Sequence, residues 1–401
     1  MAQCAADLAM ISWSQTLLAR LPPIQGIYRI PRQGLKAARG ISFVWCDGDD
    51  AVRSSELNSC YRPHVFSRFP PGNLGILPAC LLAVVAISGC RSPESQSEPP
   101  ALSEVEVKAI GFLQGEVPKW SRENGCFSCH NNGDAARALL AALKLGYPVP
   151  TSALADTAEW VSRPDAWSNN KGDPGFSDQR LADIQFAAAL HSAQTAMPDS
   201  KGLDSHTTLR KAALRVAAAQ DVDGSWRIEP QNPVGSPATY GTALATFMAW
   251  RTLRAGEGSE LAPASQKASN WLQGLQPVNV PAAAVVVMAS VERGSGAQDS
   301  QVSNAIAFLK TAQTSAGGWG PYLDGPPEVF DTALALLALS RFSDAGIKQM
   351  VRRGRSFLGA NQLPDGSWPA TTRPPGGASY AQAMSTSGWA TLALLATRSR
   401  K

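Results

Sequence analysis

The sequence has no cysteine after residue 129, and this absence limits the chemistry of most of the chain. Histidine is scarce as well, because none of the four follows His206. A long C-terminal part without either residue has no disulfide framework and no thiol nucleophile. It also lacks late cysteine and histidine ligands for a zinc ion. All seven cysteines lie in the first third of the chain: Cys4, Cys46, Cys60, Cys80, Cys90, Cys126 and Cys129.

Charged residues are also few, at 17% of the chain, and the net charge is only +4. Most of that excess lies in the first ninety residues, so the remainder of the chain is nearly neutral. No basic stripe with interleaved aromatic residues occurs, and we therefore expect no nucleic-acid partner. Alternating runs of β-branched residues are scarce too, whereas alanine and leucine dominate the C-terminal three quarters. This composition predicts an all-α domain.

The N-terminal hundred residues divide into three segments of different character. Residues 1–63 show no sustained period, which indicates either an over-long gene start or a disordered extension. Residues 64–90 contain an apolar run at 75–88, which is too short to span a bilayer and has the length of a signal-peptide core. The run ends in Ile87-Ser88-Gly89-Cys90, which resembles a bacterial lipobox. Residues 91–100 have the composition of a flexible tether.

The lipobox resemblance implies that Cys90 becomes the lipidated first residue of an exported protein. We expect such a protein to be held by its lipid on the periplasmic face of a bacterial membrane, most simply the outer membrane. An ordinary signal peptide or a short anchor is the alternative. The partner expected at this end of the chain is therefore a membrane.

A CxxCH sequence, defined by Cys126, Cys129 and His130, stands just ahead of a helical run at 134–143. Two thiols three positions apart can add to the two vinyl groups of one porphyrin, and the adjacent imidazole then reaches the iron. We therefore predict a covalent haem c attached to Cys126 and Cys129, with His130 as a ligand of the iron. Export agrees with this prediction, because c-type haem is attached outside the cytoplasmic membrane. A dithiol redox pair, a partial metal site and a vestigial motif are alternatives.

The sequence leaves the sixth position of that iron open. A five-coordinate iron with a free face is one alternative. An ordinary structural role is the alternative for each candidate ligand. These candidates are His191, His206, Met197, Met248, Met288 and Met384.

Residues 101–401 form one domain built from a repeat of about fifty residues. The first half of each unit is amphipathic, and the second half is apolar almost all round, so it must be buried. The apolar halves lie at 135–143, 184–190, 241–250, 282–290, 331–340 and 389–397. Six units with one half-exposed and one buried helix predict two concentric rings, an (α/α)6 toroid.

Three of the units contain a glutamine followed by Gly-x-Trp, at 220–226, 313–319 and 362–368. The glycine supplies turn geometry, the tryptophan covers the seam between repeats, and the glutamine can bond exposed backbone at a helix end. This pattern resembles the QW repeat of the squalene-hopene cyclases. The helix pairs resemble the α/α-toroid superfamily, which also holds protein prenyltransferase β-subunits. The resemblance implies the toroid fold over residues 101–401.

The resemblance raises two enzyme activities, and the residues argue against both. A squalene-type cyclase uses an Asp-x-Asp-Asp acid, whereas the nearest match, Asp221-Val-Asp223, lacks the last carboxylate and belongs to a Gly-x-Trp turn. A protein prenyltransferase needs Asp, Cys and His around zinc, and the late Cys and His are absent. Asp331, Glu328 and Tyr240 stand at the entries of inner helices. We interpret Asp331 first as a helix N-cap, and the question of enzyme activity stays open.

We predict from these features an exported lipoprotein whose toroid carries one c-type haem for electron transfer or redox sensing. Such a role implies a redox partner protein, and the toroid cavity also suits a hydrophobic small molecule. The alternatives are a haem-free binding module for an isoprenoid or glycan and a divergent terpenoid-cyclase-like enzyme. The segment from Cys126 to Asp134, placed before a toroid helix, resembles a group of exported bacterial squalene-cyclase-like proteins with cytochrome-type motifs.

Overall fold

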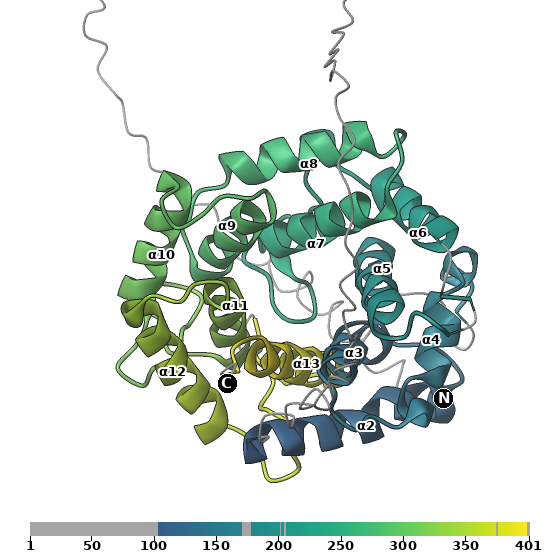
Figure 1. Cartoon of the computed structure of the whole chain (residues 1–401), viewed down its shortest axis with the longest axis horizontal. Coiled ribbons are helices and arrows are strands. Elements are labelled where there is room, and N and C mark those ends of the chain that lie inside the picture. The colour runs from purple at the N-terminus through teal and green to yellow at the C-terminus, as the bar shows by residue number, and fades with distance from the viewer. Residues whose placement is uncertain (1–102, 171–177, 201, 204–205, 374–375, 399–401) are drawn as a thin grey trace, which may run out of the picture. The chain divides into compact units, whose positions relative to one another are not determined.

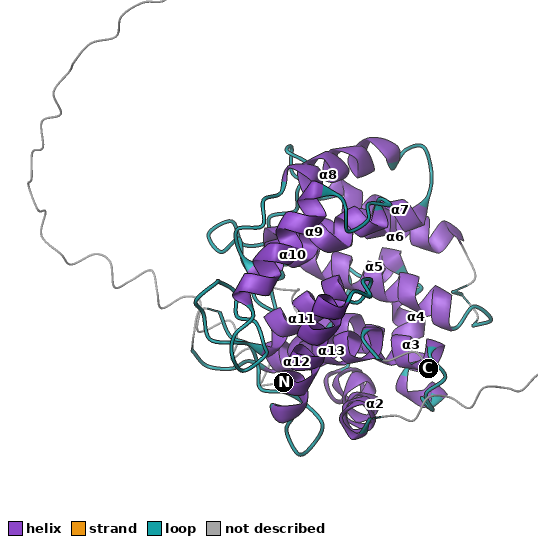
Figure 2. Ribbon diagram, turned by 60° about the vertical axis from the view of Figure 1, so that its left-hand side comes forward, coloured by secondary structure: helices purple, strands orange, loops and turns teal. Residues whose placement is uncertain are grey.

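The computed structural model describes residues 103–170, 178–200, 202–203, 206–373 and 376–398. The predicted extension, signal segment and tether, with Cys90, lie outside these residues. The regular structure of the described part is helical, as Figure 2 shows, and an isolated β-bridge joins Trp319 to Glu328. The prediction of an all-α domain is therefore confirmed.

Twelve α-helices of the described chain form six pairs, each with an outer and an inner member (Figure 1). The outer helices are α2 (Glu104–Asn124), α4 (Ala155–Val161), α6 (His206–Ala218), α8 (Ala262–Gly274), α10 (Ser300–Ala312) and α12 (Ala345–Ala360). The inner helices are α3 (Ala136–Lys144), α5 (Gln179–Ala196), α7 (Gly241–Gly256), α9 (Val280–Glu292), α11 (Val329–Leu339) and α13 (Tyr380–Ala396). Each inner helix packs on the next, and α13 packs on α3. The inner ring therefore closes, and the predicted α/α toroid is confirmed.

The inner and outer helices differ in how they distribute apolar residues. The inner helix α9 is buried along almost its whole length, because alanine and valine fill it on all sides. The outer helix α12 buries one face through Ile347, Met350, Gly354, Phe357 and Leu358, at the spacing of successive helical turns. The two patterns place α9 inside and α12 outside, as the sequence predicted.

The Gln…Gly-x-Trp turns tie each repeat to the next outer helix. Gln220 donates through Nε2 to the carbonyl oxygens of Gly224, at 3.0 Å, and of Ala264 in α8, at 2.9 Å. The indole Nε1 of Trp226 donates to the Val216 carbonyl oxygen at 3.0 Å, and the ring is fully buried. The same bonds recur at Gln313 with Trp319 and at Gln362 with Trp368. The predicted structural role of these turns is confirmed.

The last of these turns closes the ring onto its first helix. Gln362 donates to the carbonyl oxygen of Val105 in α2 at 2.9 Å. Gly366 has a φ of +93°, and a Cβ at that position would lie 2.2 Å from the Lys108 carbonyl oxygen. Only glycine combines this backbone conformation with so close an approach. The first and last repeats are thus joined by the device that joins neighbours within the chain.

Two inner helices are longer than their apolar pattern predicts. The helix α5 begins at Gln179 and α13 begins at Tyr380, several residues before the apolar runs. Polar residues toward the N-terminal ends of these two helices, Gln185 and Ser385, are fully buried because they bond to other buried polar groups. None of the described helices is long and apolar enough to cross a membrane.

Candidate functional site

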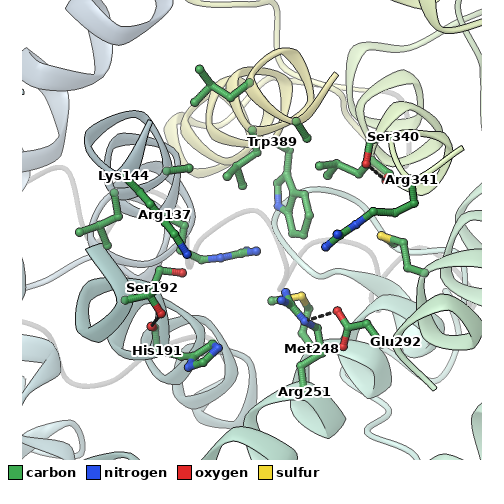
Figure 3. Close-up of a pocket in the computed structure, with 18 of the residues that line it drawn as sticks. Arg137, Lys144, His191, Ser192, Met248, Arg251, Glu292, Ser340, Arg341 and Trp389 are labelled. Carbon is green, nitrogen blue, oxygen red and sulfur yellow. Dashed lines mark hydrogen bonds and ion pairs between the residues drawn. The ribbon is translucent and has the colours of Figure 1, made fainter. Parts of the chain in front are cut away.

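The six inner helices enclose a cavity of about 500 Å³ toward their C-terminal ends (Figure 3). Every inner helix contributes residues to its wall. Part of the wall is apolar, with Phe247, Met248, Met288, Leu337 and Leu392 among its residues. A volume of this size with an apolar lining is typical of sites for small organic ligands.

Positive charge is concentrated in this cavity. One carboxylate, that of Glu292, stands among the lining residues against five cationic side chains. Figure 3 shows the side chains of Arg137, Arg251 and Arg341 converging on the centre from three different helices or helix ends. The five cationic residues are Arg137, Lys144, Arg251, Arg341 and Arg398. The lining therefore carries a clear excess of positive charge.

Neighbouring groups in the cavity show the effect of this excess. Arg251 is paired with Glu292 at 2.7 Å between Nε and Oε1. Burial, together with the charges of Arg137 and Arg341, lowers the pKa of Arg251, although an arginine stays protonated in proteins. Burial and the nearby Arg251 charge also lower the pKa of His191, so its imidazole is neutral at pH 7. The cavity thus disfavours further positive charge.

Helix dipoles explain some of these cations and leave one unexplained. The C-terminal end of a helix favours cations, and Lys144, Arg341 and Arg398 stand at or just beyond such ends. Arg137 stands near the start of α3, where the π-helix Cys129–Ala135 runs directly into it, and is far from the C-terminal end that would favour a cation. Its burial, with 7% of its surface exposed, makes that position costly. Arg137 therefore requires negative partners.

The first such partner is Asp134, which begins the same inner helix. Asp134 Oδ1 lies 3.5 Å from Nη1 of Arg137, and the carboxylate is fully buried. Tyr240 donates its hydroxyl to Oδ1, while Ser385 and Gln185 donate to Oδ2 at 2.7 and 2.8 Å. Burial raises the pKa of Asp134, and the Arg137 charge and these three donors oppose that rise. Three inner elements thus hold the carboxylate in place behind the arginine.

The same network reaches the CxxCH segment through His130. Nδ1 of His130 lies 2.9 Å from Oγ of Ser385. Because the Ser385 hydroxyl donates its hydrogen to Asp134, the imidazole must donate from Nδ1. Burial lowers the pKa of His130 to about 4, so the ring is neutral at pH 7. The Nε2 atom of this tautomer carries the lone pair.

The structure places the predicted haem thiols in the interior of the protein. Cys126 is 2% exposed and Cys129 is 7% exposed. The loop between them is held on both sides: Phe127 stacks on Trp160 with ring centroids 4.4 Å apart, and Asn170 bonds both the N–H and the carbonyl of Phe127. A porphyrin attached to both sulfurs would have to displace this packing. Attachment of a covalent haem would therefore require a different conformation of this loop.

The candidates for the sixth iron position are dispersed. His191, Met248 and Met288 line the cavity, and His130 does not. Met384 is buried beside Ser385, while Met197 follows α5 and His206 begins α6 on the surface. Within the described residues, no group of three or more His, Cys, Asp or Glu side chains is placed to hold a metal ion.

The remaining acidic candidates form two separate structures. Asp221 and Asp223 accept bonds from residues of their own turn, as in Ser225 N–H to Asp223 at 3.1 Å. Glu328 and Asp331 share Arg373, whose Nη2 donates to Glu328 Oε2 at 3.0 Å and to Asp331. Burial raises the pKa of Asp331 to about 7, with Arg373 opposing the rise and Glu328 adding to it.

The carboxyl pair only partly resembles the acid of a squalene-type cyclase. Glu328 and Asp331 have the spacing of the outer carboxylates of Asp-x-Asp-Asp, but Phe330 stands at the third position. Neither carboxyl residue lines the cavity. The structure also separates Tyr240 from this pair and bonds it to Asp134. Asp331 is therefore a buried acid beside a half-buried Glu328, and neither residue reaches the described cavity.

The residues that define the cavity were missed at the sequence level. Arg137 lies inside an apolar run and Arg251 directly follows another, and this was the available signal. A charge on a buried helix requires a partner or a ligand. Asp134, three residues before Arg137, carries the same signal.

Comparison with known proteins gives a family match to part of the chain. Residues 275–401, which include α9 to α13, match the family model described as the squalene-hopene cyclase C-terminal domain. No curated protein matches the chain. The fold and this match define the class of protein: an α/α toroid whose C-terminal part resembles that cyclase domain.

Solved structures resemble the chain at low identity. The type II terpene cyclase MstE from Scytonema is 15% identical, with a TM-score of 0.46 over 73% of this chain and 97% of that one. The ent-copalyl diphosphate synthase from Streptomyces platensis is 16% identical, with a TM-score of 0.43 over 72% and 50%. A protein from Actinoplanes is 14% identical, with a TM-score of 0.46 over 73% and 99%. At these identities neither a ligand nor an activity carries over.

Proposed function

We propose that this toroid is a binding module for an organic anion, which enters the cavity at the C-terminal ends of the inner helices. One observation carries the proposal: five cationic side chains line the cavity against a single carboxylate. Like charges gathered around one cavity repel one another, so such a cluster is stabilised by an anionic ligand. This function belongs to the binding-module alternative and requires no haem.

The cavity wall indicates that the anion has an apolar portion. Met248, Met288, Leu337 and Leu392 supply surface that a small inorganic ion would leave uncovered. Burying an alkyl or isoprenoid-like group there stabilises the complex by about 25 cal/mol for each Å² removed from water. The ligand we propose is therefore amphiphilic, with a negative head and an apolar body.

Three probes with the same eight-carbon tail test this function by isothermal titration calorimetry: octyl phosphate, octanoate and octanol. We expect at least one of the two anions to bind about 10-fold or more tighter than octanol. Pairing the single charge of the ligand with the cavity cations is enough for such a factor. Arg341→Glu should remove this preference. Arg352→Glu, on the exposed face of the outer helix α12, is the matched control and should leave it unchanged. Equal binding of all three probes, or binding of none, would contradict the proposal.

A covalent haem at Cys126 and Cys129, with electron transfer or redox sensing, is the second candidate. The observation that favours it is the neutral His130 imidazole with its lone pair on Nε2, the form that ligates iron. The burial of both thiols stands against it. No step of the proposed function depends on this cofactor.

We also propose that the protein is exported and anchored by a lipid on Cys90, on the strength of the apolar run and lipobox-like sequence alone. The intact mass of protein purified from bacterial membranes tests both modifications at once. A lipid addition should be lost in Cys90→Ser, and a haem addition should be lost in the double variant Cys126→Ala/Cys129→Ala. A mature protein without either addition would contradict both the lipid anchor and the covalent haem.

A further inference from the structure

Two buried donors among the cavity-lining residues make no hydrogen bond with the described residues, although one of them keeps its 3.5 Å ion pair with Asp134. They are Nη1 of Arg137 and Nε1 of Trp389, both enclosed so fully that neither atom is exposed. The residues themselves are 7% and 2% exposed. A buried donor without an acceptor is destabilising, so Trp389 Nε1, beside an arginine held only by a long ion pair, points to an acceptor that the protein itself does not supply.

The two donors stand close together. The guanidinium of Arg137 lies over the Trp389 ring, with Cζ 4.8 Å from the ring centroid. Figure 3 shows the indole nitrogen on the side of the ring that faces Arg137. Both residues lie seven positions before the helix-end residues Lys144 and Ala396 that also line the cavity. Seven residues of helix span about 10 Å, so the donors lie on the floor rather than at the mouth.

Buried polar residues behind the cavity floor hold Arg137 in place. Asp134 is held by Tyr240, Ser385 and Gln185, and its ion pair with Arg137 fixes the guanidinium at the start of α3. An oxyanion on the floor would therefore meet donors that are already oriented, which lowers the cost of binding.

The surrounding cations favour a tetrahedral oxyanion. Arg251 and Arg341 approach the centre of the cavity from directions different from that of Arg137 (Figure 3). A phosphate group presents oxygens in several directions and carries up to two charges, whereas a carboxylate presents two oxygens in one plane. Arginine side chains that converge from several sides match the phosphate better.

We infer that Arg137 and Trp389 form an oxyanion subsite on the cavity floor, which binds the phosphate head of an amphiphilic phosphomonoester. This inference rests on the proposed function and names the ligand class and the two donors of that same site. The head lies against the Arg137 guanidinium and Trp389 Nε1, and the apolar body lies along Met248 and Leu392. Asp134 acts as the positioning residue.

Trp389→Phe tests the inference because it keeps an aromatic ring on the floor and removes only the indole N–H. We expect octyl phosphate to bind wild-type protein about 10-fold tighter than octanoate, and the variant to lose about 10-fold in affinity for octyl phosphate, the value of one charge-assisted hydrogen bond. Arg137→Gln should lose more. Trp368→Phe is the matched control, because its indole donates to the Leu358 carbonyl and lies outside the cavity lining.

An NMR readout separates a contact from a structural effect. In protein labelled with 15N-tryptophan, the indole N–H signal that disappears in Trp389→Phe should move downfield in wild-type protein on adding octyl phosphate. The indole N–H groups of Trp319 and Trp368 are already bonded to backbone carbonyls, so their signals should keep their chemical shifts. Unchanged affinity in Trp389→Phe, an unmoved Trp389 signal, or equal affinity for octanoate and octyl phosphate would overturn the inference while leaving anion binding intact. Failure of both anions to bind better than octanol would instead overturn the proposed function.

Discussion

The two ends of the inner ring hold charges of opposite sign, and the protein supplies partners for those at one end only. At the N-terminal ends, the carboxyl groups of Asp134 and Asp331 are fully buried and bonded to protein donors. At the C-terminal ends, Lys144 and Arg341 make no ion pair with described residues. Helix dipoles favour both placements, so the dipole does not account for the difference.

This difference separates a structural cluster from a binding site. A buried carboxylate with several donors is complete within the protein, and its removal leaves those donors unpaired. A group of cations that share one carboxylate is incomplete, and the remaining counter-charge comes from solution. Arg137 belongs to both ends, because it pairs with Asp134 behind it and faces the cavity in front. Three predictions compare the stability of the two ends.

Asp134→Asn should give the largest effect. The substitution leaves Arg137 buried without its counter-charge. It also replaces a carboxylate that accepts three hydrogen bonds with an amide. We expect the free energy of unfolding, measured by urea denaturation, to fall by about 3 kcal/mol, as when one partner of a buried pair is removed.

Asp156→Asn is the matched control, because Asp156 also pairs with one arginine, Arg122 at 3.4 Å, but with 41% of its side chain exposed. A surface pair of this kind contributes less than about 1 kcal/mol. Equal losses in the two variants would mean that the Asp134 cluster is no more structural than the surface.

The sequence predicted the ring better than it predicted the site, and the reason is physical. The Gln…Gly-x-Trp turns and the apolar inner helices are local patterns, and each one predicts its own contact with the next repeat. The cavity depends on Arg137, Arg251 and Arg341, which meet only when the whole ring closes. Which face of an inner helix points into the cavity is set by packing and leaves no local pattern.

The CxxCH segment also depends on a contact between distant parts of the chain that no local pattern predicts. Its spacing predicts the attachment of a cofactor, whereas the partner of His130 is Ser385, 255 positions later in the chain. The buried serine lies in the polar first half of α13, which the apolar pattern did not include. A polar residue in an inner helix was the available signal, and its partners could not be read from the sequence.

Asp331 should give the acidic end a pH dependence that the cavity end lacks. Its pKa is raised from 3.8 to about 7 by burial, so the folded protein holds a proton that the unfolded chain releases. The Asp331 contribution to stability is therefore present below pH 4 and is lost as pH rises from about 4 to about 7. His130, with a pKa lowered to about 4, has the opposite slope between pH 4 and 6.5, so the comparison must be between variants.

Asp331→Asn removes this titration. We expect the free energy of unfolding of wild-type protein, minus that of the variant, to fall steadily as the pH rises from 4 to 7. Urea denaturation of both proteins at four pH values measures the difference. A difference that is constant with pH would show that Asp331 does not hold a proton in the folded state.

Neutralising a cavity cation should give the smallest effect, and in the other direction. Arg341 is exposed at the mouth, makes no ion pair with described residues, and lies near the like charges of Arg251 and Arg137. Arg341→Gln removes repulsion and breaks no bond, so we expect the free energy of unfolding to stay unchanged or rise by less than about 1 kcal/mol. Urea denaturation in the absence of any anion checks this, and adding octyl phosphate should stabilise wild-type protein more than the variant. A clear loss of stability in Arg341→Gln without ligand would mean that the cations are bonded within the protein, and the contrast between the two ends would then disappear.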